Sequence, residues 1–174
     1  MIYYNGENLI IRSMLESDIE EFVKGFLEQG WHKSQELFSN YYNEQENRKK
    51  LVIVAEVDGN VAGYVTLLPF AKVGPFANMN IPEIVDFNVL IKYQRKGIGK
   101  KIMDISEKLA KQKSENVSLA VGLHSGYGSA QRMYIKRGYI PDGSGVWYKE
   151  KQLEPYTQCE NDDDLILYFL KSLK

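Results

Sequence analysis

Two glycines in a basic turn are the residues of this sequence best suited to bind a charged ligand. Gly97 and Gly99 follow an apolar, β-branched run and precede a helical pattern of isoleucines. The first amides of a helix have no partner within it, and the aligned peptide dipoles place a partial positive charge there. Because glycine has no Cβ, a ligand can approach such a backbone closely. The turn therefore predicts an anion site that could hold a phosphate.

Positive charge is concentrated around this turn. Eight Lys or Arg residues lie between Lys92 and Lys113, against only Asp104 and Glu107. This local excess favours a ligand with several negative charges. The glycine spacing fits neither a P-loop nor a dinucleotide site. The whole chain has a formal net charge of −1, which argues against a dedicated nucleic-acid-binding protein.

Hydrophobic periodicity indicates the elements that must position the turn. Strands are predicted at residues 8–12, 51–57, 61–68, 82–91, 117–123, 147–148 and 165–170. Residues 16–50 predict two helices, starting near a Ser17-Asp18 cap and broken near Gly25 and Gly30. Further helices are predicted at residues 97–113 and from Ser129 to Gly138. A hairpin is expected at residues 58–60 and a loop at 70–81.

Length and composition bound the class of protein. A chain of 174 residues is most simply one domain, spanning residues 1–174, and can bury about 70% of its unfolded surface. The single cysteine excludes an internal disulfide and fits a reducing compartment. No apolar run approaches membrane-spanning length, and the N-terminus lacks the layout of a signal peptide. We expect a soluble cytoplasmic protein that binds neither membrane nor nucleic acid.

Three motifs of the chain resemble those of the GNAT superfamily of acetyl-CoA-dependent N-acetyltransferases. The family's cofactor signature reads Gln/Arg-x-x-Gly-x-Gly/Ala, and this chain has Gln94, Gly97 and Gly99 in those places. The family's Asn-x-x-Ala-x-x-Leu-Tyr-x-x-x-Gly-Phe stretch is matched by Ala130, Met133, Tyr134, Gly138 and Tyr139. The upstream hairpin, Val57-Asp58-Gly59-Asn60-Val61-Ala62-Gly63-Tyr64, is also typical of the family. The chain is identified as a GNAT member on these motifs, which cover roughly residues 51–140.

The resemblance implies a fold and a cofactor. The fold is of the α/β (α+β) class, with a mixed, mostly antiparallel central sheet of about seven strands flanked by about four helices. Acetyl-CoA would pair its pantetheine arm with strand amides near Phe87 and Val89. Its phosphates would be held by the turn and by neighbouring side chains. The other cofactor-binding residues expected are Gln94, Arg95, Lys96, Gly97, Ile98, Gly99, Lys100, Ala130 and Tyr134.

The reaction implied is transfer of an acetyl group to a primary amine by direct attack. A free alkylamine has a pKa of about 10.4, so a base must remove its proton. Glu83 and Asp86 are the candidate bases, although in an unbulged strand they point to opposite faces. The alternatives are a structural carboxylate at Asp86 and a solvated charge at Glu83. Tyr134 is the candidate acid that protonates the departing thiolate, with core packing as its alternative role.

The acceptor is predicted only as a small-molecule or peptide amine. Trp31, His124 and Tyr127 are candidate substrate-binding residues because they fall at chain breaks, where binding residues concentrate. Core packing for Trp31 and ordinary hydrogen bonding for His124 are the alternatives. No His, Cys, Asp or Glu grouping has metal-ligand spacing, so no metal is expected. The apolar run at residues 165–170 permits a homodimer.

Two departures from the family pattern support a rival interpretation. Val85 stands where many relatives carry Glu, and Tyr127 stands where Asn is usual. A non-catalytic acyl-CoA-binding or regulatory module on the same fold would tolerate both changes. A phosphate-binding domain for another nucleotide is a more remote alternative.

Overall fold

The chain forms two compact units in a computed structural model that describes all 174 residues. The first unit comprises residues 1–68 and 85–109, and the second comprises residues 69–84 and 110–174. Strand β5 (Glu83–Val89) belongs to both, because its first two residues lie in the second unit. The expectation of a single domain stays a prediction.

The first unit is built on a sheet in which the strands are neighbours in sequence order. Its strands are β1 (Ile2–Asn5), β2 (Leu9–Ser13), β3 (Leu51–Val57), β4 (Asn60–Leu68) and residues 85–89 of β5. The first four pair antiparallel. Gly63 allows β4 to approach β5 closely, because a Cβ there would lie 2.6 Å from the Asn88 carbonyl oxygen.

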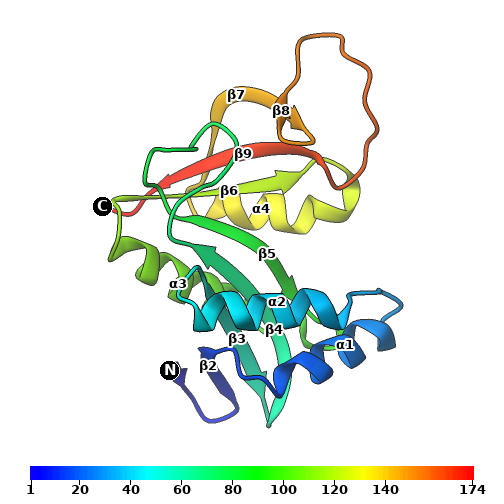
Figure 1. The fold of residues 1–174 in the computed structure, drawn as a ribbon, viewed down its shortest axis with the longest axis vertical. Helices are drawn as coiled ribbons and strands as arrows, with labels where there is room; N and C mark the ends of the chain where they lie inside the picture. The colour runs from blue at the N-terminus through cyan, green and yellow to red at the C-terminus, as the bar shows by residue number, and fades with distance from the viewer. The chain divides into compact units, whose positions relative to one another are not determined.

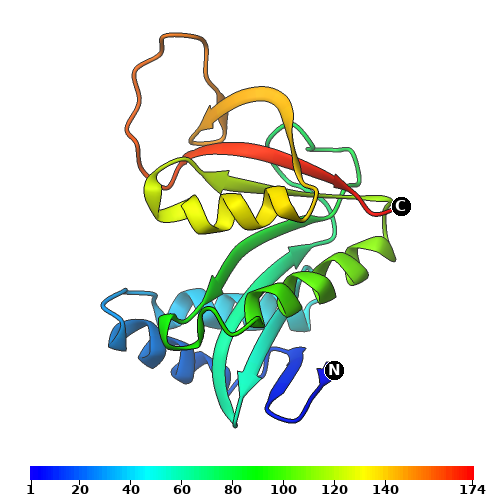
Figure 2. The same cartoon turned by 180° about the vertical axis from the view of Figure 1, so that it is seen from behind.

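Helices cover both faces of this sheet. Helices α1 (Asp18–Glu28) and α2 (Gln35–Glu46) lie on one face, and α3 (Ile98–Lys111) lies on the other, as Figures 1 and 2 show from opposite sides. Phe22 and Phe26 of α1 pack with Phe38 of α2 against Tyr64 of β4 in a buried aromatic cluster. None of the helices has the length and apolar character needed to cross a bilayer.

The start and middle of α1 differ from the sequence prediction. Ser17 makes no capping bond with its side chain; Asp18 instead accepts from the Leu15 amide at 2.8 Å and pairs with Arg12 at 2.7 Å. The helix also continues through Gly25, where a break was expected. Gly25 is tolerated because it packs on Leu90, whose Cδ1 would lie 2.8 Å from an added Cβ.

The second unit is a smaller sheet with one helix. The first two residues of β5 pair in parallel with β6, which is followed in the sheet by β9, β7 and β8. Its elements are β6 (Asn116–Gly122), α4 (Gly128–Lys136), β7 (Ile140–Tyr148), β8 (Lys151–Gln152) and β9 (Leu165–Ser172). The loop of residues 69–82 covers one face of these strands, and α4 lies on the opposite face (Figures 1 and 2).

The predicted fold class is confirmed, since the sheet is mixed and mostly antiparallel and four α-helices flank it. The strand count is nine instead of about seven. Strands β1 and β8 were missed because they have only four and two residues, too few for an alternating pattern to be visible.

Several predicted boundaries were also wrong. Strand β7 begins at Ile140, well before the predicted residue 147, because its irregular middle contains Gly143 and Gly145 at positive φ. Helix α4 starts at Gly128, and Tyr127, not Ser129, occupies its N-cap position. Its predicted end is correct, since Gly138 has φ of 86°.

Candidate functional site

The turn after β5 has a backbone that only a few residue types tolerate. A short 3-10 turn (Ile91–Tyr93) follows β5, and the Gln94 side chain then donates to the Val89 carbonyl at 2.9 Å. Arg95 and Gly97 both have positive φ, at 60° and 80°. This left-handed geometry turns the chain into α3.

The amides at the start of α3 are open. The first hydrogen bond into this helix runs from the Lys101 amide to the Gly97 carbonyl at 3.1 Å. The amides of residues 98–100 therefore have no partner in the helix. An added Cβ at Gly97 would meet no atom within 4 Å, so the space beside the turn is open. These groups fit a diphosphate.

Exposed cations surround this turn, as the sequence predicted. Arg95, Lys96 and Lys100 all have exposed side chains. The Lys96 ammonium lies 5.6 Å from the centre of the Tyr93 ring. Gly99 faces back to β5, where an added Cβ would lie 3.1 Å from Phe87 Cζ. The first unit thus brings together Phe87, Val89 and the whole segment from Gln94 to Lys100.

Asp86 is the most heavily hydrogen-bonded carboxylate of the first unit. Its oxygens accept from Tyr64 at 2.6 Å, from Asn88 at 2.7 Å, from Tyr41 at 2.8 Å and from Lys33 at 2.8 and 3.1 Å. Asp86 itself has φ of 48°, so strict side-chain alternation does not hold through this point of β5. Its partners are side chains and not the backbone amides expected for a structural carboxylate.

The two tyrosines beside Asp86 act as hydrogen-bond donors. Burial raises the pKa of Tyr64 and of Tyr41 above the ordinary value, and the negative charge of Asp86 raises both further. Both hydroxyls therefore stay protonated. The Tyr64 hydroxyl also accepts from Lys33 at 2.8 Å.

Glu83 lies in the second unit in a different environment. Only 6% of the residue is exposed, and its carboxylate makes no hydrogen bond or ion pair. Burial raises its pKa from 4.5 to about 7. The alternative of a solvated charge at Glu83 is therefore wrong. A carboxyl group with this pKa can both take up and release a proton near neutral pH.

Strand register places Glu83 on the same face as an aromatic group. Glu83 pairs with Ser118, and Tyr168 pairs with Ala120, two residues further along β6. Positions two apart on a strand share a face. Tyr168 packs against Trp147 at 5.4 Å between ring centres. Burial first, and then the charge of Glu83, raises the pKa of Tyr168 to about 12.

Tyr134 lies in α4, within the stretch that matches the second family motif. The residue is 6% exposed and packs edge-on against Tyr139 at 5.8 Å. Burial, and then the neighbouring Tyr127, raises the pKa of its hydroxyl. That hydroxyl makes no hydrogen bond in this structure, so it is available as a donor. Ala130 precedes it by four residues on the same helix.

His124 and Tyr127, two of the candidate substrate-binding residues, lie together with an acidic partner. Asp163 lies 2.9 Å from His124 Nε2 and accepts from the Tyr127 hydroxyl at 2.9 Å. His124 Nδ1 accepts from the Gly126 amide at 3.1 Å, so in the neutral ring Nε2 carries the proton. The His124 side chain is therefore engaged in hydrogen bonding, the alternative that the sequence left open.

Trp31 belongs to the first unit, whereas the other two candidate substrate-binding residues belong to the second. It is 47% exposed and stacks on Phe26 at 6.2 Å between ring centres. Sequence reasoning missed Lys33, Tyr41 and Tyr64, which donate hydrogen bonds to Asp86. It also missed Tyr168, whose pKa the charge of Glu83 raises. Only Lys33 had a usable signal, because it follows Gly30 at the predicted helix break.

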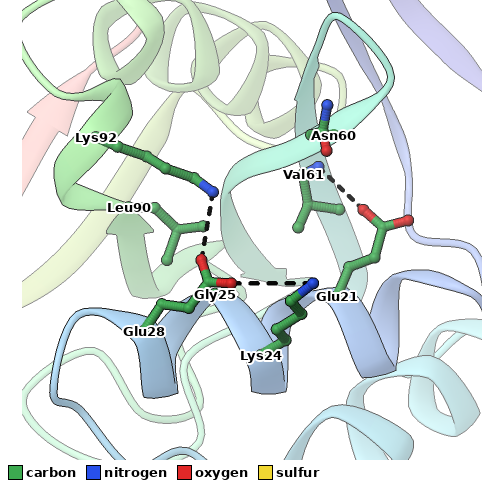
Figure 3. A pocket seen from close by; sticks show the side chains of 8 residues that line it. All are labelled: Glu21, Lys24, Gly25, Glu28, Asn60, Val61, Leu90 and Lys92. Carbon is green, nitrogen blue, oxygen red and sulfur yellow. Dashed lines mark hydrogen bonds and ion pairs between the residues drawn. The ribbon is translucent and has the colours of Figure 1, made fainter.

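A separate hollow of about 110 Å³ lies between α1 and the start of β4 (Figure 3). Its charged side chains pair with each other: Glu28 lies 3.6 Å from Lys92 and 4.0 Å from Lys24. Glu21 accepts from the Val61 amide at 3.2 Å. The hollow holds none of the predicted site residues.

The sequence matches the profile of the Acetyltransferase (GNAT) family over residues 11–139. This match covers most of the chain and includes the glycine turn, both candidate carboxylates and Tyr134. The chain belongs to the GNAT acetyltransferase family. No curated protein is similar enough in sequence to this GNAT protein to count as a match.

Solved structures of low sequence identity share the GNAT fold. Ribosomal-protein-alanine N-acetyltransferase from Brucella melitensis is 17% identical, with a TM-score of 0.66, over 93% of this chain and 98% of that chain. A GNAT acetyltransferase from Staphylococcus aureus Mu50 is 19% identical, with a TM-score of 0.64, over 95% and 99% of the two chains. YncA from Salmonella typhimurium, determined with its cofactor acetyl-CoA, is 16% identical, with a TM-score of 0.65, over 97% and 95%.

Proposed function

We propose that this GNAT protein is an acetyl-CoA-dependent N-acetyltransferase that acts on a primary amine of a small molecule or peptide. The observation that carries the proposal is the turn at Gly97 and Gly99, which opens α3 with three unpartnered amides among exposed cations. A helix of 14 residues supplies the dipole that favours a phosphate there. Acetyl-CoA would supply an acetyl group activated as a thioester.

Each candidate residue has a role that its environment supports. The amides of residues 98–100 would hold the diphosphate, and Arg95, Lys96 and Lys100 would add charge-assisted hydrogen bonds. Residues 87 and 89 would offer backbone amides to the pantetheine arm. Ala130, small and in the first turn of α4, would leave room for the ligand.

Glu83 is the better candidate for the general base. The residue is 6% exposed, and burial raises its pKa to about 7, so that it can accept a proton from the amine at neutral pH. Asp86 already accepts five hydrogen bonds from four side chains, one of them cationic, and is less able to accept a further proton. Tyr134, with its free hydroxyl, would protonate the departing sulfur.

Titration calorimetry combined with a thiol-release assay tests this function. We expect acetyl-CoA to bind, and free thiol to appear with at least one member of a panel of primary amines. Binding without thiol release for any amine would favour the non-catalytic acyl-CoA-binding module. Val85 and Tyr127, which depart from the family motif, are the reason for considering that module. An absence of heat with acetyl-CoA would contradict both functions.

A further inference from the structure

The ammonium group of Lys33 lies in a cage in the first unit. The groups that line this cage are typical of an ammonium-binding site. Its Nζ lies 2.8 Å from Asp86 Oδ1 and 2.8 Å from the Tyr64 hydroxyl. The same nitrogen lies 5.3 Å from the centre of the Phe26 ring and 5.5 Å from that of Tyr64. A carboxylate combined with aromatic faces is how proteins recognise alkylammonium groups.

The walls of the cage make contacts that do not involve Lys33. Asp86 also accepts from Tyr41, Tyr64 and Asn88, at 2.6 to 2.8 Å, and these bonds orient its carboxylate. Phe26 and Tyr64 belong to the buried aromatic cluster and are held by their other neighbours. Lys33 therefore contributes charge to the cage and no part of its wall.

Lys33 is also able to leave. It lies in residues 31–34, which form no regular structure between α1 and α2. Its side chain and that of Asp86 are each 22% exposed, so the ion pair can be reached from solvent. The flexible four-carbon stem of a lysine can take another rotamer without disturbing either helix.

We propose that this ammonium cage, formed by Phe26, Tyr41, Tyr64 and Asp86, anchors an ammonium group of the acceptor, and that Lys33 occupies it when no acceptor is bound. The identification of the ligand as the acceptor rests on the proposed acetyl transfer. The binding of an ammonium group by the cage does not.

The chemistry of the cage restricts the acceptor to molecules with two amines. A carboxylate, the Tyr64 hydroxyl oxygen and the Phe26 ring stabilise the charged form of any amine bound there. The nucleophile must be neutral, so the anchored nitrogen is not the one that reacts. A second, neutral amine of the same molecule would attack the thioester carbonyl of acetyl-CoA, so that a C–N bond forms and the C–S bond breaks. The proton lost by this nitrogen would end on the departing sulfur, which leaves as free thiol, while the anchored amine keeps its charge. The acceptor class is therefore an aliphatic diamine or polyamine.

The first test is calorimetric titration with propylammonium chloride. The Lys33→Ala variant removes three methylene groups and the nitrogen, which is the size of this probe. We expect this variant to bind propylammonium at least about tenfold more tightly than the wild type, because an occupied site lowers the apparent affinity by the occupied fraction. Lys33→Ser, a second small replacement, should behave in the same way if the alanine variant folds poorly.

Three matched variants separate the cage from general charge effects. Lys33→Met removes the charge but keeps an apolar stem in the cage, so it should bind no better than the wild type. Lys24→Ala removes an 80% exposed lysine of α1 and should also leave binding unchanged. Adding Asp86→Asn to Lys33→Ala should abolish the gain. Equal affinity of the wild type and the Lys33→Ala protein, or a gain that survives Asp86→Asn, would overturn the cage.

Kinetics test the acceptor class separately. We expect kcat/KM of the wild type to be at least about tenfold higher for 1,4-diaminobutane than for butylamine, since only the diamine can fill the cage and react. Lys33→Ala should lower KM for the diamine alone. Equal kcat/KM for the two amines would refute the diamine acceptor. If no amine releases thiol in any protein, the proposed function fails, while the calorimetry still decides on the cage.

Discussion

Two carboxylates on one strand illustrate how the environment of a residue sets its chemistry. Glu83 and Asp86 are three positions apart and were equal candidates for the base. Asp86 is saturated with donors, whereas Glu83 is buried without any. Desolvation disfavours a charge that hydrogen bonds do not compensate, which is why the pKa of Glu83 rises. The two residues are therefore suited to different tasks: Asp86 to holding a cation and Glu83 to moving a proton.

Activity should rise as the pH increases through about 7, because Glu83 must be ionised to accept a proton. Glu83→Gln should lower kcat by more than about tenfold and remove this rise. The measurement is kcat/KM of both proteins as a function of pH. An unchanged profile in the variant would assign the base to another group.

The free energy of unfolding should also depend on pH through the ionisation of Glu83. The pKa of Glu83 is 4.5 when unfolded and about 7 when folded, so the folded state holds the proton more tightly. This group's contribution to the free energy of unfolding is full below pH 4.5, falls as the pH rises to about 7, and is constant above that. Glu83→Gln should therefore be more stable than the wild type at alkaline pH, by up to about 3 kcal/mol.

Urea unfolding at several pH values checks this expectation. The advantage of the Glu83→Gln protein should disappear as the pH is lowered below the unfolded-state pKa. A difference that is independent of pH would show that packing, and not ionisation, separates the two proteins.

Tyr134→Phe should lower kcat by more than about tenfold while leaving acetyl-CoA affinity nearly unchanged. The change removes the hydroxyl that would protonate the sulfur, and it keeps the ring that packs on Tyr139. Steady-state kinetics and calorimetry measure the two quantities independently. A variant with full activity would leave Tyr134 with its alternative role in core packing.

At the scale of elements, the glycines of this protein allow backbone segments to lie close to their neighbours. The turn before α3 was found from its glycines because positive φ is a local property. Gly63 and Gly25 were not understood from sequence, since each makes room for a partner far away in the chain, at β5 and at Leu90. The difference between local properties and distant contacts also applies to the strands. The pattern of β3 was visible in its own residues, whereas β1 and β8 are too short to show one and are strands because they pair with a neighbour.

Gly63→Ala should destabilise the protein by about 1 to 3 kcal/mol, because its Cβ would meet the Asn88 carbonyl of β5 and push two strands apart. Gly128→Ala is the matched control. Its Cβ would meet no atom within 4 Å, and it begins α4 without a positive φ, so its effect should stay within about 0.5 kcal/mol. Urea midpoints compare the two. Equal stability of the two variants would contradict the close approach of β4 and β5.

At the scale of the whole molecule, the charge is nearly balanced but unevenly distributed. A net charge of −1 conceals the cluster of cations around the start of α3. The apolar run that suggested a homodimer forms β9, which lies between β6 and β7 and has a paired neighbour on each side. Pairing within one chain therefore explains why this run is apolar, and the homodimer stays a prediction.

Acetyl-CoA affinity should fall several-fold when the ionic strength is raised from about 0.05 M to about 0.5 M, because in the proposed site exposed cations would bind the phosphates. Lys100→Gln should weaken binding and reduce this salt dependence. Lys111→Gln, at the other end of the same helix, should change neither. Calorimetry at the two salt concentrations measures both effects, and an affinity independent of salt would argue against phosphate binding by these side chains.

The sequence by itself determined the family, the fold class and the position of the glycine turn before α3, because glycine spacing, charge density and hydrophobic period are carried by neighbouring residues. Only the tertiary structure decided which carboxylate is free to act and which is bound by Lys33 and two tyrosines. Those environments arise from residues 22 to 85 positions away in the chain, such as Tyr64 for Asp86 and Tyr168 for Glu83. Burial and hydrogen bonding between such distant residues set the chemistry of a side chain, and no local pattern records them.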